Sequence, residues 1–248
     1  SSDLSRKGRE VSENQGVCGK WRSIFRRKNT KWLFYLLIPA SILIGIKVFQ
    51  DRAYIWISLW IALLSAVPFF LAFERRKANT KRMLLLSVLT ALSVLGRFVF
   101  APLPHFKPVT AMVVLTGMYV GAESGFLCGA LTAILSNILF GQGPWTPFQM
   151  MTWGIIGLLS ALFSRWLQKS RWFLAGFGAL AGVLFSLIMD VWTVLGFEDG
   201  FSLSRYLAAA AAALPVTAVY AGSNVIFLLV LAKPIGEKIR RVIEKYGV

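Results

Sequence analysis

Residues 140–149, ten residues between two apolar runs, carry side chains suited to holding a small molecule. The stretch reads Phe-Gly-Gln-Gly-Pro-Trp-Thr-Pro-Phe-Gln, and its glycines and prolines fix the backbone of a turn. Ring faces and hydrogen-bonding groups come from Phe140, Gln142, Trp145, Thr146 and Gln149. This composition is typical of a ligand site. The alternative is a tight turn between helices, with Trp145 as an interfacial anchor.

Further candidate binding residues lie in two other connections and inside the apolar runs. One connection carries Pro104, His105, Phe106 and Lys107, and another carries Glu198, Asp199 and Phe201. Polar residues within apolar runs are costly in a membrane, so they face a cavity, a partner or the bundle interior. The candidates within or beside these runs are Asn137, Trp153, Asp190 and Trp192. Asn137 and Asn224 are interpreted first as interhelical hydrogen-bonding residues, and Asp190 equally as a residue that ties helices together.

The sequence holds no pattern that predicts catalysis. It has no phosphate-binding loop, no Gly-x-Ser-x-Gly turn and no His-Glu-x-x-His motif, and His105 is its only histidine. Cys18 lies in a polar segment and Cys128 in an apolar run, so no disulfide or metal site is expected. We therefore expect a protein that is not an enzyme and has no intrinsic cofactor. A membrane enzyme using Asp190 with Glu198 or Asp199 is the third-ranked alternative.

Composition indicates the class of protein in which these candidate residues lie. Of 248 residues, 56% are hydrophobic, and the mean hydropathy is +0.65. The apolar residues form long blocks of about 20 residues, the length that spans a bilayer. An all-α polytopic membrane protein follows. The formal net charge of +16 lies mostly beside these blocks, which indicates topology and contact with lipid headgroups rather than nucleic acid.

The blocks predict two units. Residues 1–31 form a basic cytoplasmic tail, 32–73 an accessory transmembrane hairpin, 74–82 a cytoplasmic linker, and 83–248 a six-helix unit with a basic tail. The six expected segments of that unit, of which the second and third are short for a span, are 83–100, 108–121, 124–140, 148–167, 172–195 and 206–232.

Lysine and arginine predict the orientation. Placing the amino terminus in the cytoplasm puts most basic residues of the connections on the inside, which supports eight spans with both termini cytoplasmic. The outer connections of the six-helix unit are then 101–107, 141–147 and 196–205, and together they could roof a pocket. We expect a multi-pass protein of the cytoplasmic (inner) membrane.

Small residues at helical spacing allow close contact between helices. Ser87 and Ala91 form one such stripe, and Gly125, Gly129 and Ala133 form another. Each is interpreted either as internal packing or as a surface for a partner protein.

From residue 81 to the carboxyl terminus the chain resembles the substrate-binding S components of energy-coupling-factor (ECF) vitamin transporters. The resemblance rests on five stretches taken together, at residues 87–97, 107–111, 121–130, 141–147 and 233–239.

The resemblance implies a six-helix protein that captures a vitamin at the outer face. It further implies partners, namely a membrane scaffold (T) subunit and two cytoplasmic ATPase subunits. Docking through an Ala-xxx-Ala pattern on the first helix would fall on Ser87 and Ala91, where the serine departs from the pattern.

The same resemblance bears on the ligand. The turn at 141–147 is most similar to S components for cobalamin or other corrinoids, and a ring-rich, weakly charged site suits a large amphiphilic ligand. Riboflavin and queuosine precursors are alternatives. The runner-up from another class is a structural or regulatory membrane subunit that binds no small molecule.

Overall fold

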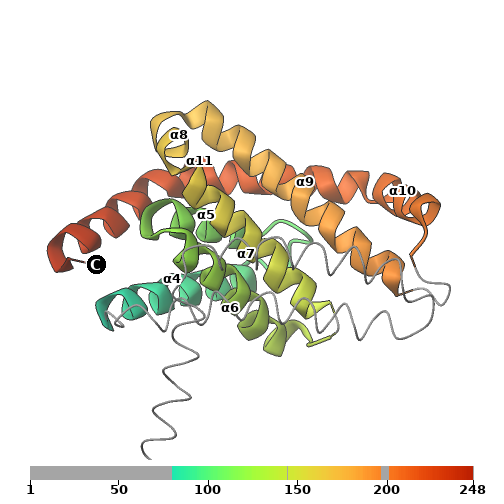
Figure 1. The fold of residues 1–248 in the computed structure, drawn as a ribbon, viewed down its shortest axis with the longest axis horizontal. Helices are drawn as coiled ribbons and strands as arrows, with labels where there is room; N and C mark the ends of the chain where they lie inside the picture. The colour runs from blue at the N-terminus through green and yellow to red at the C-terminus, as the bar shows by residue number, and fades with distance from the viewer. Residues whose placement is uncertain (1–79, 144, 197–200, 248) are drawn as a thin grey trace, which may run out of the picture. The chain divides into compact units, whose positions relative to one another are not determined.

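Helices account for all regular secondary structure in residues 80–143, 145–196 and 201–247, the parts that the computed structural model describes (Figure 1). These residues all belong to one compact unit of the chain. The all-helical fold predicted from composition is thereby confirmed for this part. The predicted tail at 1–31, the hairpin at 32–73 and most of the linker lie outside the described residues. The helices are α4 (Thr80–Val99), α5 (Val109–Val120), α6 (Ala122–Phe140), α7 (Thr146–Leu162), α8 (Ser164–Lys169), α9 (Arg171–Leu195), α10 (Leu203–Ala212) and α11 (Leu214–Tyr246).

Four of the described helices are long and apolar enough to cross a membrane: α4, α6, α9 and α11. Helix α5 is apolar but has only 12 residues, as the short second segment predicted. The third segment is longer than expected, because α6 begins at Ala122 and reaches 19 residues.

Two of the predicted segments are each divided into a short and a long helix. The segment at 148–167 breaks at Phe163 into α7 and α8, and the segment at 206–232 breaks at Ala213 into α10 and α11. Proline in the first turn of α11 fits the second break, because the first turn is the position in a helix that proline favours. Helix α11 then continues for 33 residues, with Pro234 in its interior.

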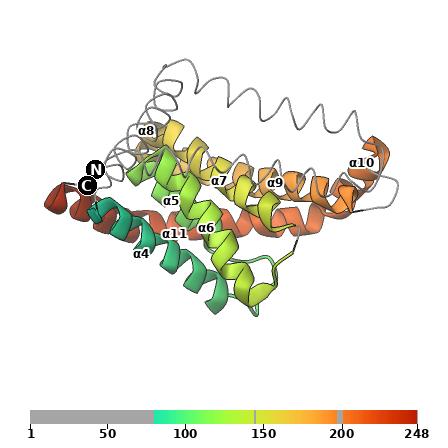
Figure 2. The same cartoon turned by 60° about the horizontal axis from the view of Figure 1, so that its bottom comes forward.

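Helix α5 lies at the centre of the unit. It packs against α4, α6, α7, α9 and α11, and ten of its residues, Val109 to Met118, are buried (Figure 2). The most extensive contacts join α6 to α7 and α9 to α11, which run side by side in both views. A helix that is apolar on every side and buried on every side explains why α5 can be shorter than a membrane span.

Glycines let α5, α6 and α7 approach to backbone contact. A Cβ at Gly117 or Gly157 would overlap backbone atoms of the facing helix, and a Cβ at Gly125 would overlap both other glycines. Gly129 lies equally close to the backbone of Trp153 on α7. The stripe containing Gly125 and Gly129 is therefore internal packing, the first of its two interpretations.

Helix α4 buries one stripe and exposes the other. Its buried residues, Leu86, Leu89, Ser93 and Arg97 among them, recur every three or four positions, so they share one face of the helix. The last residue of the buried stripe is Arg97, whose charged side chain lies inside the bundle. Ser87 and Ala91 lie on the exposed side.

Candidate functional site

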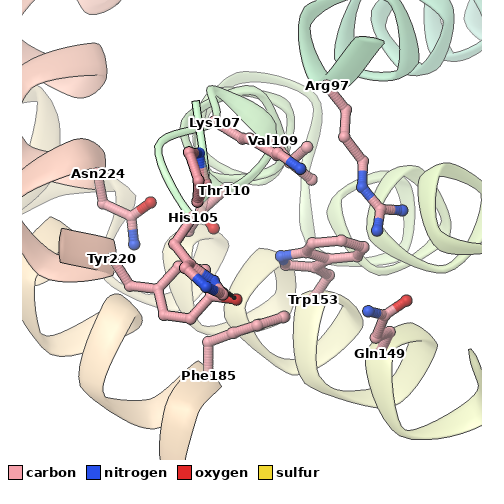
Figure 3. Close-up of a pocket in the computed structure, with 11 residues that line it drawn as sticks. Arg97, His105, Lys107, Val109, Thr110, Gln149, Trp153, Phe185, Tyr220 and Asn224 are labelled. Atoms are coloured by element: carbon pink, nitrogen blue, oxygen red, sulfur yellow. Dashed lines mark hydrogen bonds between the residues drawn. The ribbon is translucent and has the colours of Figure 1, made fainter. Parts of the chain in front are cut away.

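A cavity of about 280 Å³ lies where the end of α4, the start of α5 and the connection between them meet α7, α9 and α11 (Figure 3). Its lining comes from positions far apart in the sequence: Arg97, Pro104, His105, Lys107, Val109, Thr110, Gln149, Trp153, Phe185, Tyr220 and Asn224. Ligand pockets commonly measure roughly 300–1,000 Å³, so this cavity lies just below the small end of that range.

Aromatic rings form one wall. Trp153 and Phe185 stack with ring centroids 5.2 Å apart, and Phe185 meets Tyr220 edge-on at 5.0 Å. Trp153 and Phe185 are both buried, whereas Tyr220 is half-buried at the rim. Such a wall offers a flat ring both dispersion contacts and aromatic stacking.

The connection between α4 and α5 is held over the cavity by two contacts with α11. The His105 ring nitrogen Nδ1 lies 3.0 Å from the Tyr220 hydroxyl, the pair joined by a dashed line in Figure 3. The Lys107 backbone N–H donates to Ser223 Oγ at 3.0 Å. His105 has a φ of 60°, a conformation that residues other than glycine seldom adopt. Tyr220 therefore fixes a strained residue of the connection in place.

Arg97 brings a positive charge into the cavity. Its side chain is 9% exposed, and its guanidinium points toward Trp153 and Gln149 in Figure 3. Nη1 donates to Ser136 Oγ and, at 2.8 Å, to Asn137 Oδ1. The guanidinium carbon lies 4.8 Å from the Phe140 ring centroid and 5.3 Å from that of Trp153, within range of cation–π attraction.

The turn between α6 and α7 positions Arg97 and Gln149 through Asn137. The Asn137 amide nitrogen donates to Thr146 Oγ1 at 2.9 Å and to Gln149 Oε1 at 2.8 Å. Thr146 donates in turn to Gln142 Oε1, and Gln142 donates to the Ile134 carbonyl. The polar groups of this turn are therefore used mainly within the protein.

Lys107 supplies a second positive charge. Its ammonium group lies 4.9 Å from the centroid of the same Phe140 ring that Arg97 covers. Burial, and then the charge of Arg97, lower the pKa of Lys107 from its ordinary value. The cavity thus places two like charges near each other beside an aromatic wall.

Five of the predicted binding residues line this cavity: Pro104, His105, Lys107, Gln149 and Trp153. Two more, Asn137 and Phe140, are outside the lining but contact Arg97, which belongs to it. Thr146 is one step further away, since it accepts a hydrogen bond from Asn137. The remaining predicted residues lie elsewhere.

Phe106 packs against Phe100 and Phe227 in the core. Gln142 and Trp145 are exposed, and Trp192 contacts Phe148. Asp190 is outside the lining, and one of its carboxylate oxygens is buried without a hydrogen-bond partner among the described residues. Glu198 and Asp199, the proposed acidic partners of Asp190, lie outside the described residues.

The sequence analysis missed six residues of the lining as ligand contacts: Arg97, Val109, Thr110, Phe185, Tyr220 and Asn224. Arg97 carried a usable signal, because a charge within an apolar block generally faces a cavity. Phe185 and Tyr220 carried none, since aromatic residues are common in any apolar block.

Metal binding has no support in the part of the chain that the structure describes, where no three His, Cys, Asp or Glu side chains are grouped. The lining instead places an aromatic wall, two amide side chains and two positive charges around one cavity.

Comparison with known proteins gives one match. A family model described as "ECF-type riboflavin transporter, S component" matches residues 77–241, which is more than half of the chain. No curated protein and no solved structure gives a significant match. The matched region contains every residue that lines the cavity.

Proposed function

This chain belongs to the S-component family of ECF transporters, and from that premise we propose that its cavity captures a flat, ring-containing vitamin, with riboflavin as the leading candidate. Membership makes the chain a substrate-binding subunit of a membrane transporter and not an enzyme. The vitamin, its side of entry and the partners are the proposal.

The observation that carries the proposal is the aromatic wall. Trp153, Phe185 and Tyr220 line one cavity, with Gln149 and Asn224 also in its lining. Rings of this kind bind a planar heterocycle, and a few amides fix its orientation by hydrogen bonding.

The size of the cavity favours a vitamin smaller than a corrinoid. A cavity of about 280 Å³ suits a single fused ring system better than a corrin ring with its nucleotide substituent. The family match likewise gives cobalamin no support, because its description names riboflavin. We therefore place riboflavin ahead of the corrinoid that the 141–147 turn suggested.

The proposed route of entry follows from the distribution of basic residues. The cavity lies beside the 101–107 and 141–147 connections, which that distribution assigns to the outer side. Binding at the outer face would be followed by uptake with a scaffold subunit and two ATPase subunits. The exposed side of α4, which includes Ser87 and Ala91, is the proposed docking surface for the scaffold.

The test begins with protein purified in mild detergent. Small molecules that co-purify are identified by mass spectrometry, and riboflavin, cobalamin and a queuosine precursor are then titrated. We expect riboflavin to bind, and Tyr220→Leu to weaken that binding by about two- to tenfold, since an aromatic contact adds roughly 0.5–1.5 kcal/mol beyond the area it buries. Trp172→Leu is the matched control, because Trp172 is 89% exposed and lies outside the cavity.

Two results would contradict the proposal. Folded protein that binds no vitamin in a broad panel, yet co-purifies with a membrane partner, would indicate the structural or regulatory subunit instead. Equal loss of binding in the Tyr220 and Trp172 variants would remove the assignment to this cavity.

A further inference from the structure

The two positive charges of the cavity have no carboxylate partner among the described residues. Within the described residues, both hydrogen bonds of the Arg97 guanidinium go to neutral oxygens, those of Ser136 and Asn137, and the Lys107 ammonium contacts the Phe140 ring. Neither residue forms an ion pair within the part of the chain that the structure describes. Buried charges are generally paired, so this arrangement requires an explanation.

Asp190 does not supply the missing charge. It lies outside the cavity lining, and its buried carboxylate oxygen has no hydrogen-bond partner among the described residues, Arg97 and Lys107 included. Besides burial, the charge that lowers the pKa of Lys107 is that of Arg97, and both groups are positive. The two cations therefore repel each other across a cavity in which no described acid separates them.

Hydrogen-bond donors are also left over. Both hydrogen bonds that Arg97 makes within the described residues come from Nη1. Nε and Nη2 therefore remain for a ligand, as do the three N–H donors of Lys107. A guanidinium and an ammonium that face the same space offer the donors that carboxylates and phosphates accept.

We infer that the cavity prefers ligands that combine a flat ring with an acidic group, a carboxylate or a phosphate monoester, so that riboflavin 5′-phosphate binds more tightly than riboflavin itself. The acidic group lies between Arg97 and Lys107 while the ring contacts Trp153, Phe185 and Tyr220. This inference rests on the proposed function, because it concerns the ligand of the same cavity. An anion there supplies the missing counter-charge to both cations and accepts their remaining N–H donors. Asn137 and the turn behind it hold the guanidinium in position for that contact.

The experiment compares molecules that differ only in the acidic group. Three pairs are titrated against the purified protein: riboflavin with riboflavin 5′-phosphate, nicotinamide with nicotinate, and biotin amide with biotin. In the pair whose ring the cavity accepts, we expect the acid to bind at least tenfold more tightly than the neutral partner. The riboflavin pair tests a phosphate, and the other two test a carboxylate.

Lys107→Gln tests the residues. It removes one charge from a half-buried side chain while retaining most of its length and a polar end, and we expect the ratio of acid to neutral affinity to fall about tenfold. Lys238→Gln is the control, because Lys238 is exposed on α11 and does not line the cavity. A purely structural role for Lys107 would weaken both members of a pair and leave their ratio unchanged.

The outcomes separate this inference from the proposed function. A neutral vitamin that binds as tightly as its acidic partner, with a ratio that Lys107→Gln leaves unchanged, would overturn the inference while the S-component function stands. Absence of binding by every molecule, vitamins included, would overturn both. If the acid binds at least tenfold more tightly, and this preference is lost in Lys107→Gln but kept in Lys238→Gln, both the inference and the proposed function are supported.

Discussion

Asn137 connects the two polar parts of the cavity through one amide group. Its oxygen accepts from Arg97, and its nitrogen donates to Thr146 and Gln149. The side chain is only 1% exposed, so water cannot replace these partners. The identity of this single residue therefore determines where a charge and an amide of the lining lie.

Replacing Asn137 with leucine should destabilise the fold. The change keeps the approximate volume but leaves buried donors of Arg97 and acceptors of Gln149 without partners, at a cost of roughly 1–3 kcal/mol for each unsatisfied group. We expect a lower midpoint of thermal unfolding in detergent. Ser87→Ala is the control, because Ser87 is exposed and bonds only within its own helix, so its change should fall within about 0.5 kcal/mol. Equal midpoints for the two variants would contradict this role for Asn137.

Lys107 makes ligand affinity dependent on pH. Because burial and the Arg97 charge lower the pKa of Lys107, the ammonium loses its proton before an ordinary lysine does. Raising the pH through that lowered value should weaken binding of an acidic ligand. In Lys107→Gln the alkaline loss attributable to this group should disappear. Arg97, His105 and Tyr220, the other charged or titratable groups of the lining, are present in both proteins, so the difference between them isolates Lys107.

The stability of the unliganded protein should follow the opposite trend. Between the lowered pKa of folded Lys107 and the ordinary value of the unfolded chain, the unfolded state binds more protons, so the contribution of this group to stability rises with pH. Below both values the charged group carries its full penalty. Thermal unfolding across the alkaline range, wild type against Lys107→Gln, measures this contribution. A contribution that falls with pH would show that an unrecognised anion pairs with Lys107.

At the scale of elements, the position of α7 depends on three glycines. Gly117, Gly125 and Gly157 meet where α5, α6 and α7 cross, and none leaves room for a Cβ. Because α7 carries both Gln149 and Trp153, its distance from α5 sets the width of the cavity. The close approach of these helices thus shapes the proposed binding site, although no glycine lines it.

Gly157→Ala should therefore separate the helices. Overpacking of this kind costs roughly 1–3 kcal/mol, and we expect both a lower unfolding midpoint and weaker ligand binding. Gly176→Ala is the matched control, since Gly176 lies inside α9 with nothing within 4 Å of its added Cβ. That change should stabilise the helix by about 0.5–1 kcal/mol. A Gly157 variant as stable as the Gly176 variant would contradict the packing argument.

At the scale of the whole molecule, the exposed face of α4 should serve uptake rather than binding. Ser87 and Ala91 lie on this face, away from the buried stripe that ends at Arg97. We expect Ala91→Trp to leave vitamin affinity unchanged and to abolish uptake by the assembled transporter, because a bulky side chain prevents close helix contact. The measurements are a binding titration and an uptake assay in cells. Ala218→Trp, at an exposed position of α11, is the control. Normal uptake by the Ala91 variant would remove the docking proposal.

The helices could be predicted from the sequence because their signal is local. Long apolar blocks predicted six segments, and the structure changes them only by breaks at Phe163 and Ala213 and by shifts at their ends. The lining depends instead on which side chains meet after packing. Gln142 and Thr146 were recognisable as polar groups. The sequence does not show that Gln142 bonds to the Ile134 carbonyl or that Thr146 bonds to Asn137. Likewise, nothing local distinguishes Phe185 or Tyr220 from aromatic residues that face lipid.

The wide spacing of the lining along the chain has a consequence for synthesis. In sequence order, the lining begins at Arg97 and ends at Asn224. The cavity therefore cannot form until α11 has left the ribosome and packed against α9. A chain that stops before α11 would carry most of the aromatic wall and still have no enclosed space. Vitamin binding would then stabilise only newly made protein that has folded completely, since a ligand that binds only the completed fold shifts the folding equilibrium toward it. Cells supplied with the vitamin during expression would accumulate more of this subunit.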